Sequence, residues 1–221
     1  MAALDPTWDL ARIGTYLRDG LSRALVPVAA ALDLTMTMQR FGQQPPGNPT
    51  KPFIIYGGTV GYALPTHRAL AARMRAGSPS PLTIPFDISL NEIICAAEPV
   101  MLAGSLPLRV STAEDIVAEK LRALLQQALR NRTRRQDLLD IAALLRAGVP
   151  LDPARVADYL LRKAAAREVA VSRAALLDPD LLARASVDYE QLAGTARRVF
   201  IPFPEASALV RAFIEALPLP G

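Results

Sequence analysis

One segment, from Ser111 to Leu145, constrains the fold of this 221-residue chain more than any other. It reads STAEDIVAEKLRALLQQALRNRTRRQDLLDIAALL, and it begins with Ser111 and Glu114 at the spacing of a capping box. In that motif each side chain binds a backbone amide at the start of a helix. Apolar residues then recur at helical spacing on both sides of the basic stretch ALRNRTRR. The segment therefore predicts two helices joined by a short turn.

Charged residues flank the apolar faces of this helical hairpin. The core-facing stripe of the first helix consists of Val117, Leu121, Leu124 and Ala128. Lys120 lies about 40° around the helix from Leu124, so its ammonium either reaches water along the apolar surface or meets an anion. If that ammonium is unpaired beside the core, replacing it by methionine should leave stability unchanged or slightly higher.

Two acids sit one turn apart near the start of the second helix. Asp137 and Asp140 each have an ordinary explanation, because the helix dipole favours acids in a first turn. Together with Lys120, however, they would form a charged cluster at the mouth of the hairpin. Such a cluster suits the binding of a phosphate ester and a metal ion.

The rest of the chain predicts an α+β fold in two lobes, residues 1–110 and 111–221. Helical spacing runs from Trp8 to Leu34, although Pro27 should end or kink that helix. The stretch FGQQPPGNPTKP predicts a loop. Three apolar runs bounded by Gly, Pro and Ser predict strands: FIIY, LTIPFDISL and LPLRV. Gly57 and Gly58 would then form a turn after the first strand, and the sequence beyond Ser111 is helical almost to its end.

Composition excludes several classes of protein. With 51% hydrophobic and 21% charged residues the chain can bury a core, so it is not disordered. Its single cysteine, Cys95, cannot form an internal disulfide, and its single histidine cannot complete a His-based metal site or a Ser-His-Asp triad. Without a membrane-length apolar run or a signal peptide, we expect a cytoplasmic protein.

Positive charge is concentrated in the hairpin. The formal net charge is +4, and six of the 25 basic side chains fall between Lys120 and Arg135. A run of this kind is either a solvated helix face or a contact for RNA. If the second interpretation holds, the RNA-binding residues are Arg130, Arg132, Arg134 and Arg135.

These residues carry a resemblance to a known family. The segment VSTAEDIVAEKLRALLQ, followed by RRQDLLDIAALL, resembles the signature of the AbiEii/AbiGii (MenT-type) toxin nucleotidyltransferases. Upstream, KPFIIY and PFDISLNE are similar to strands of that family, the second bearing an aspartate. Near the C-terminus, FPEASALVRAFIEAL is similar to its closing helix. The similarity covers Lys51 to Leu217.

The resemblance implies a polymerase-β-like nucleotidyltransferase lobe, with a small mixed sheet and flanking helices, joined to a helical lobe. It further implies Mg²⁺, a nucleoside triphosphate, an RNA acceptor such as tRNA, and a winged-helix antitoxin as partner. Lys120, assisted by Arg122, would neutralise the triphosphate. Asp137 or Asp140 would support the site, and Asp87 would be the strand carboxylate that assists the metal ions or the attacking hydroxyl.

The sequence departs from the family pattern in one respect. The family's first motif, Gly-Ser followed by Asp-x-Asp, does not precede these elements. The only Asp-x-Asp is Asp178-Pro-Asp180, whereas Gly77-Ser78 precedes Asp87 in a degenerate match that has Ser89 in place of the second aspartate. We therefore expect a nucleotidyltransferase toxin that is truncated or transfers nucleotides poorly. The alternative is a non-catalytic member that binds an antitoxin or RNA.

Overall fold

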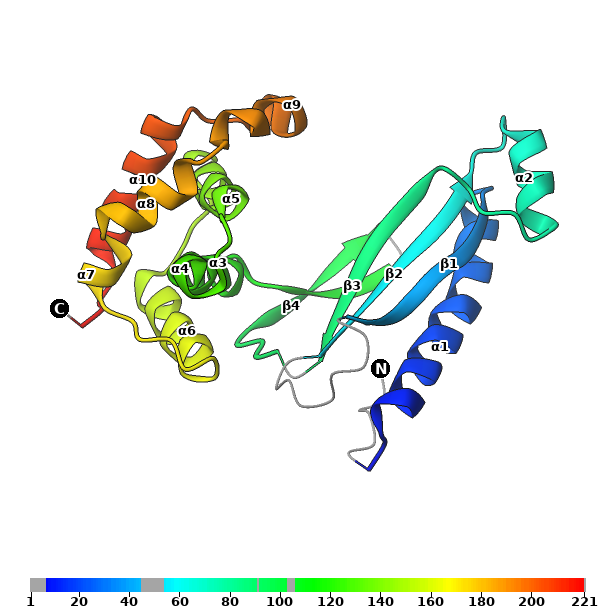
Figure 1. Cartoon of the computed structure of the whole chain (residues 1–221), viewed down its shortest axis with the longest axis horizontal. Helices are drawn as coiled ribbons and strands as arrows, with labels where there is room; N and C mark the ends of the chain where they lie inside the picture. Colours follow the sequence, from blue (N-terminus) through cyan, green and yellow to red (C-terminus); the bar gives the residue numbers. More distant parts are fainter. Residues whose placement is uncertain (1–6, 45–53, 91, 103–105, 221) are drawn as a thin grey trace. The chain divides into compact units, whose positions relative to one another are not determined.

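The computed structural model describes residues 7–44, 54–90, 92–102 and 106–220. The chain divides into two compact units, Met1–Glu92 and Ile93–Gly221, and each is described here by itself (Figure 1). The predicted α+β class is confirmed, with small antiparallel sheets and flanking helices. Residues 93–110, which the sequence analysis placed in the first lobe, are grouped with the helices. None of the described helices is long and apolar enough to cross a membrane.

The first unit is a three-stranded antiparallel sheet with strand order β1-β2-β3, so the expected mixed sheet is not found among the described strands. Its elements, in chain order, are α1 (Leu10–Ala31), β1 (Thr35–Gln44), β2 (Ile54–Ala63), α2 (Arg68–Arg75) and β3 (Thr83–Leu90).

Helix α1 covers one face of this sheet. The face carries an aromatic row in which Phe41 stacks on Tyr56, with ring centroids 5.6 Å apart, and on Phe86, at 6.2 Å. Tyr56 is buried and its hydroxyl donates to the backbone carbonyl of Leu10 in α1. Ile13 of α1 completes the small core. Because side chains alternate along a strand, the neighbouring residues of β1, β2 and β3 project from the opposite face.

The structure differs from three expectations for this unit. Helix α1 does not end at Pro27 but continues to Ala31. Residues 41–44 of the predicted loop belong to β1, which was not predicted, and the rest of that loop lies outside the described residues. Gly57 and Gly58 lie inside β2 and not in a turn. A Cβ on Gly58 would come within 2.4 Å of the Phe86 ring, so this strand needs a glycine where the aromatic row crosses it.

The second unit begins with the antiparallel hairpin of β4 (Ala97–Leu102) and β5 (Leu106–Ser111). Strand β4 was not predicted. The helices that follow are α3 (Ala113–Leu125), α4 (Gln127–Arg130), α5 (Arg135–Arg146), α6 (Pro153–Ala165), α7 (Arg173–Leu176), α8 (Pro179–Ser186), α9 (Ala193–Ala196) and α10 (Phe203–Ala216), with 3₁₀ turns at Tyr189–Leu192 and Arg197–Val199.

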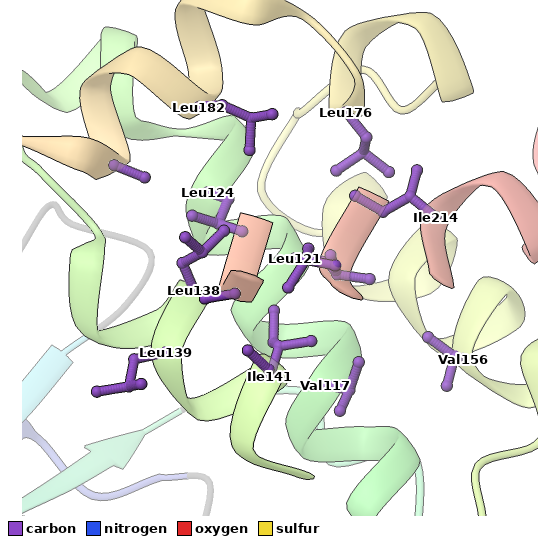
Figure 2. Close-up of a cluster of buried hydrophobic side chains, with 14 of the residues drawn as sticks. Val117, Leu121, Leu124, Leu138, Leu139, Ile141, Val156, Leu176, Leu182 and Ile214 are labelled. Carbon is purple, nitrogen blue, oxygen red and sulfur yellow. The ribbon is translucent and has the colours of Figure 1, made fainter. Parts of the chain in front are cut away.

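Helix α3 lies at the centre of the second unit. Its stripe of Val117, Leu121 and Leu124 is fully buried among apolar residues of α5, α6, α7, α8 and α10, as Figure 2 shows. The fourth predicted member of the stripe, Ala128, is exposed because α3 ends at Leu125. The helix is capped by Thr112, whose hydroxyl accepts from the amide of Asp115, and not by Ser111, which is the last residue of β5.

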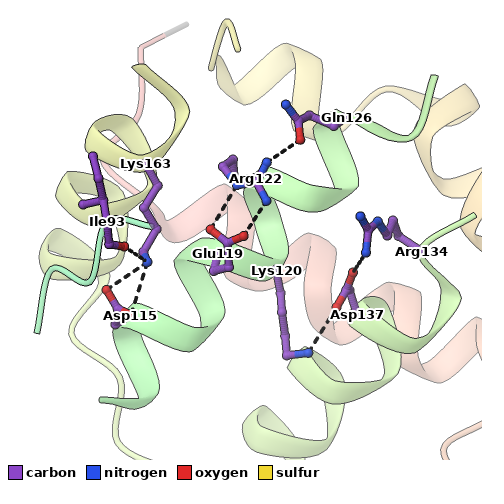
Figure 3. Close-up of polar contacts among 9 residues, drawn as sticks. All are labelled: Ile93, Asp115, Glu119, Lys120, Arg122, Gln126, Arg134, Asp137 and Lys163. Atoms are coloured by element: carbon purple, nitrogen blue, oxygen red, sulfur yellow. Dashed lines mark hydrogen bonds and ion pairs between the residues drawn. The ribbon is translucent and has the colours of Figure 1, made fainter. Parts of the chain in front are cut away.

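A buried ion pair joins α3 to α6 and to the segment before β4. Lys163 of α6 and Asp115 of α3 approach to 3.1 Å, and both side chains are 4% exposed. The ammonium also donates to the carbonyl of Ile93, at 2.6 Å (Figure 3). The carboxylate accepts from the amide of Cys95, at 2.7 Å. The pair therefore fixes three segments that are far apart in the sequence.

We predict that Lys163→Met lowers the free energy of unfolding by about 3–5 kcal/mol, because it leaves Asp115 charged and buried without a cation. Urea denaturation followed by circular dichroism measures this loss. The double variant Lys163→Met/Asp115→Asn should recover much of it. A single variant as stable as the wild type would show that the pair does not hold these segments.

Candidate functional site

The hairpin of α3 and α5 brings Lys120, Asp137 and Asp140 together, as the sequence predicted. The Lys120 ammonium donates to Asp137 Oδ1 at 3.1 Å and to Asp140 Oδ2 at 2.6 Å. Figure 3 shows Lys120 reaching from α3 to Asp137 on α5. The outer oxygens are also occupied: Asp140 accepts from Gln136 at 2.7 Å, and Arg134 lies 3.6 Å from Asp137.

The surroundings of Lys120 keep it charged. Burial alone would lower its pKa, but the hydrogen bond that Lys120 donates to Asp140 and the negative charges of Asp137 and Asp140 outweigh burial and raise the pKa above its ordinary value. The stability that this pairing contributes is therefore fully present below the ordinary lysine pKa, and it is lost only as the pH rises through the higher folded-state value. The assumption of an unpaired ammonium was wrong.

Arg122 does not join this cluster. Arg122 is 5% exposed. Its guanidinium donates to Glu119 of the same helix and to Gln126, the C-cap residue of that helix (Figure 3). The predicted contact of Arg122 with a triphosphate stays a prediction, and it would require these intrahelical bonds to break.

The four arginines of the basic turn fall into two pairs. Arg134 and Arg135 are half-buried and each lies 3.6 Å from an acid, Asp137 and Asp188 respectively. Arg130 and Arg132 are exposed, and their guanidinium groups have no ion pair or hydrogen bond within the described part of the chain. This outer pair is therefore free to meet a polyanion.

Asp87 lies in the first unit, on the sheet face opposite α1. In β1–β2–β3, Gly57 pairs with Gly42 on one side and with Asp87 on the other. Directly paired residues share a face, as do residues two apart in a strand. The face that we call the glycine face therefore carries Arg40, Gly42, Gln44, Gly57, Thr59, Pro85 and Asp87.

A hollow of about 440 Å³ opens on the glycine face. Arg40, Gln44 and Asp87 line it with exposed side chains, and Gly57 forms part of its floor. Glycine at position 57 leaves room for the Gln44 side chain, since a Cβ would come within 2.0 Å of the Gln44 amide nitrogen and 3.0 Å of Asp87 Oδ1. Among residues 7–44, 54–90, 92–102 and 106–220, no three His, Cys, Asp or Glu side chains are grouped so that they could hold a metal ion between them.

Sequence reasoning missed Arg40, Gln44 and Tyr189. The first two lie on a strand that was partly read as a loop, although alternation with Gly42 would have placed them on one face.

Tyr189 is 1% exposed, and its buried hydroxyl has no hydrogen-bond partner within the described residues. Burial, followed by the negative charges of Glu190 and Asp140, raises the pKa of Tyr189 to about 12.

The antiparallel sheets, the flanking helices and the helical unit define an α+β protein with a nucleotidyltransferase-like fold. A family model described as nucleotidyl transferase AbiEii toxin, type IV TA system, matches residues 9–212. The chain therefore belongs to the AbiEii nucleotidyltransferase toxin family, whose members are toxins of toxin-antitoxin systems, which implies an antitoxin partner. Comparison with curated proteins and with solved structures finds no match.

We predict that Lys120→Met destabilises the chain by about 1–3 kcal/mol, because Asp137 and Asp140 would then face each other without the shared cation. Urea denaturation at neutral pH measures the change. The double variant Lys120→Met/Asp140→Asn should recover a large part of the loss. Unchanged stability in the single variant would mean that the three groups are not coupled in solution.

Proposed function

We propose that this chain binds a magnesium nucleoside triphosphate and serves the transfer of a nucleotide to an RNA acceptor such as tRNA. Its membership of the AbiEii family over residues 9–212 carries the proposal. The charged side chains of both units are consistent with it. The protein would act in the cytoplasm, and its antitoxin would be of the winged-helix type.

Asp87 is suited to assist a magnesium ion. Mg²⁺ keeps several waters and is held in nucleotide sites by one or two carboxylates together with the substrate phosphates. The Asp87 carboxylate projects from β3 into the hollow, and it makes no hydrogen bond or ion pair with another described residue. Its oxygens are thus available to a hydrated metal ion, which would supply charge neutralisation at the phosphates.

Lys120 is suited to bind a phosphate in the second unit. Its side chain is 20% exposed, and its ammonium is already positioned by Asp137 and Asp140, so little side-chain entropy is lost when it binds an anion. Asp137 and Asp140 would then act by positioning this cation. The two acids also prevent a phosphate from binding there at full strength, because they share the same positive charge.

The exposed pair Arg130 and Arg132 favours RNA as the acceptor. Guanidinium groups with no protein partner keep their full capacity for phosphate contacts. This observation also supports the alternative function, a non-catalytic member that binds RNA or an antitoxin. Nucleotide binding and label transfer separate the two.

The first test is titration calorimetry of the whole chain with each magnesium nucleoside triphosphate. We predict binding of at least one of them, and at least a ten-fold weaker affinity in Asp87→Asn, since this variant loses one contact of about 1.4 kcal/mol or more. Arg211→Gln, an exposed site on α10, is the control. Labelled triphosphates and total tRNA then report transfer. RNA binding without any nucleotide binding would refute the catalytic proposal and support the alternative.

The second test concerns RNA. The double charge reversal Arg130→Glu/Arg132→Glu should weaken tRNA binding at least ten-fold at low salt and flatten its salt dependence, because fewer counterions are released. Arg198→Glu/Arg211→Glu changes the net charge equally at other exposed positions and is the matched control. Equal losses in both variants would show that only net charge matters, and no loss in either would exclude the basic turn as an RNA contact.

A further inference from the structure

The hollow on the glycine face carries charges of both signs that do not neutralise each other. Arg40 of β1 and Asp87 of β3 both line it. Neither side chain has an ion pair or a hydrogen bond within the part of the chain that the structure describes. Opposite charges that share a hollow without contact leave room for a ligand that itself carries both signs.

Two glycines of neighbouring strands form the floor between these charges. Gly42 and Gly57 are directly paired across β1 and β2, and Gly42 lies two residues from both Arg40 and Gln44 along β1. A Cβ on Gly42 would have no atom within 4 Å, so this position is open. Glycine weakens a strand interior and often marks a place where a ligand approaches the backbone closely. Here the glycines clear a path from Arg40 to Asp87.

We propose that Arg40 is a phosphate-binding residue of the nucleotide site on the glycine face, with the nucleotide lying across Gly42 and Gly57. The inference rests on the proposed function and deepens it. A magnesium nucleoside triphosphate presents phosphate oxygens that suit the guanidinium of Arg40, and a cation that suits the carboxylate of Asp87. The volume of about 440 Å³ lies within the usual range for small-molecule sites.

The Gln44 side chain covers the part of this floor at Gly57. Its amide lies over Gly57, and no hydrogen bond holds it to a described residue. An exposed and unbonded amide is displaced at low cost, after which its donor and acceptor remain beside the ligand. A ligand can therefore reach Gly57 once the Gln44 amide moves aside.

The experiment measures nucleotide binding to the whole chain by calorimetry, with magnesium and separately with EDTA. Arg40→Gln should weaken triphosphate binding at least ten-fold in both conditions, and it should not change the weak binding of the corresponding nucleoside. Asp87→Asn should weaken binding only when magnesium is present. In EDTA the substitution removes the repulsion between the Asp87 carboxylate and the phosphates, so binding should not weaken. Arg23→Gln, an exposed arginine on α1, is the matched control.

A second variant tests the path across the floor without removing a charge. Gly42→Val fits the open space and favours the strand, so its melting temperature should be unchanged or higher, while triphosphate binding falls at least ten-fold. Gly20→Ala, at an open helical position, controls for stabilisation alone.

The outcomes distinguish the inference from the proposed function. If the wild type binds triphosphate and both Arg40→Gln and Gly42→Val bind it equally well, the inference is wrong and the proposed function stands. If the wild type binds no triphosphate, both fall. If Arg40→Gln weakens binding of tRNA but not of triphosphate, the phosphate at Arg40 belongs to RNA and the inference is overturned.

Discussion

The arrangement of the helical unit depends on ion pairs within that unit. Asp115 and Lys163 are almost fully buried, and each also satisfies a backbone group in the segment before β4. This pair determines how α3 lies against α6. On the outer side of the same helix, Lys120 meets two acids of α5. Helix α3 is thus placed by ion pairs on two sides and by its apolar stripe between them, which gives Lys120 a defined position and not a mobile one.

The first unit shows the opposite arrangement. The charges of its proposed site, Arg40 and Asp87, are exposed and unpaired among the described residues, and two glycines lie in the sheet between them. The sheet itself is stabilised from the other face, where α1 and an aromatic row form a small core. One face therefore supplies stability and the other remains available for binding. This division explains why a strand as rich in glycine as β2 can persist in the middle of the sheet.

The sequence predicted elements whose signals are local. The α3–α5 hairpin and the cluster of Lys120, Asp137 and Asp140 followed from helical periodicity and a short turn, because those residues are close in the chain. Interactions between distant segments were not predictable. Gly57 and Gly58 were misread as a turn. The side chains that pack over these glycines, Gln44 and Phe86, belong to the neighbouring strands and are distant in the sequence. The ion pair of Asp115 with Lys163 joins residues 48 apart in the sequence, and no local sequence pattern predicts it. The basic turn was predicted as a unit, whereas two of its arginines are taken up by acids.

We propose that the exposed charges of the glycine face bind a magnesium nucleoside triphosphate. A crystal structure of the chain grown with magnesium and a non-hydrolysable triphosphate tests this binding most directly. We expect density for the phosphates beside the Arg40 guanidinium, and a metal ion bound directly or through water to Asp87. A nucleotide bound away from the glycine face, with Arg40 and Asp87 contacting only solvent, would contradict it.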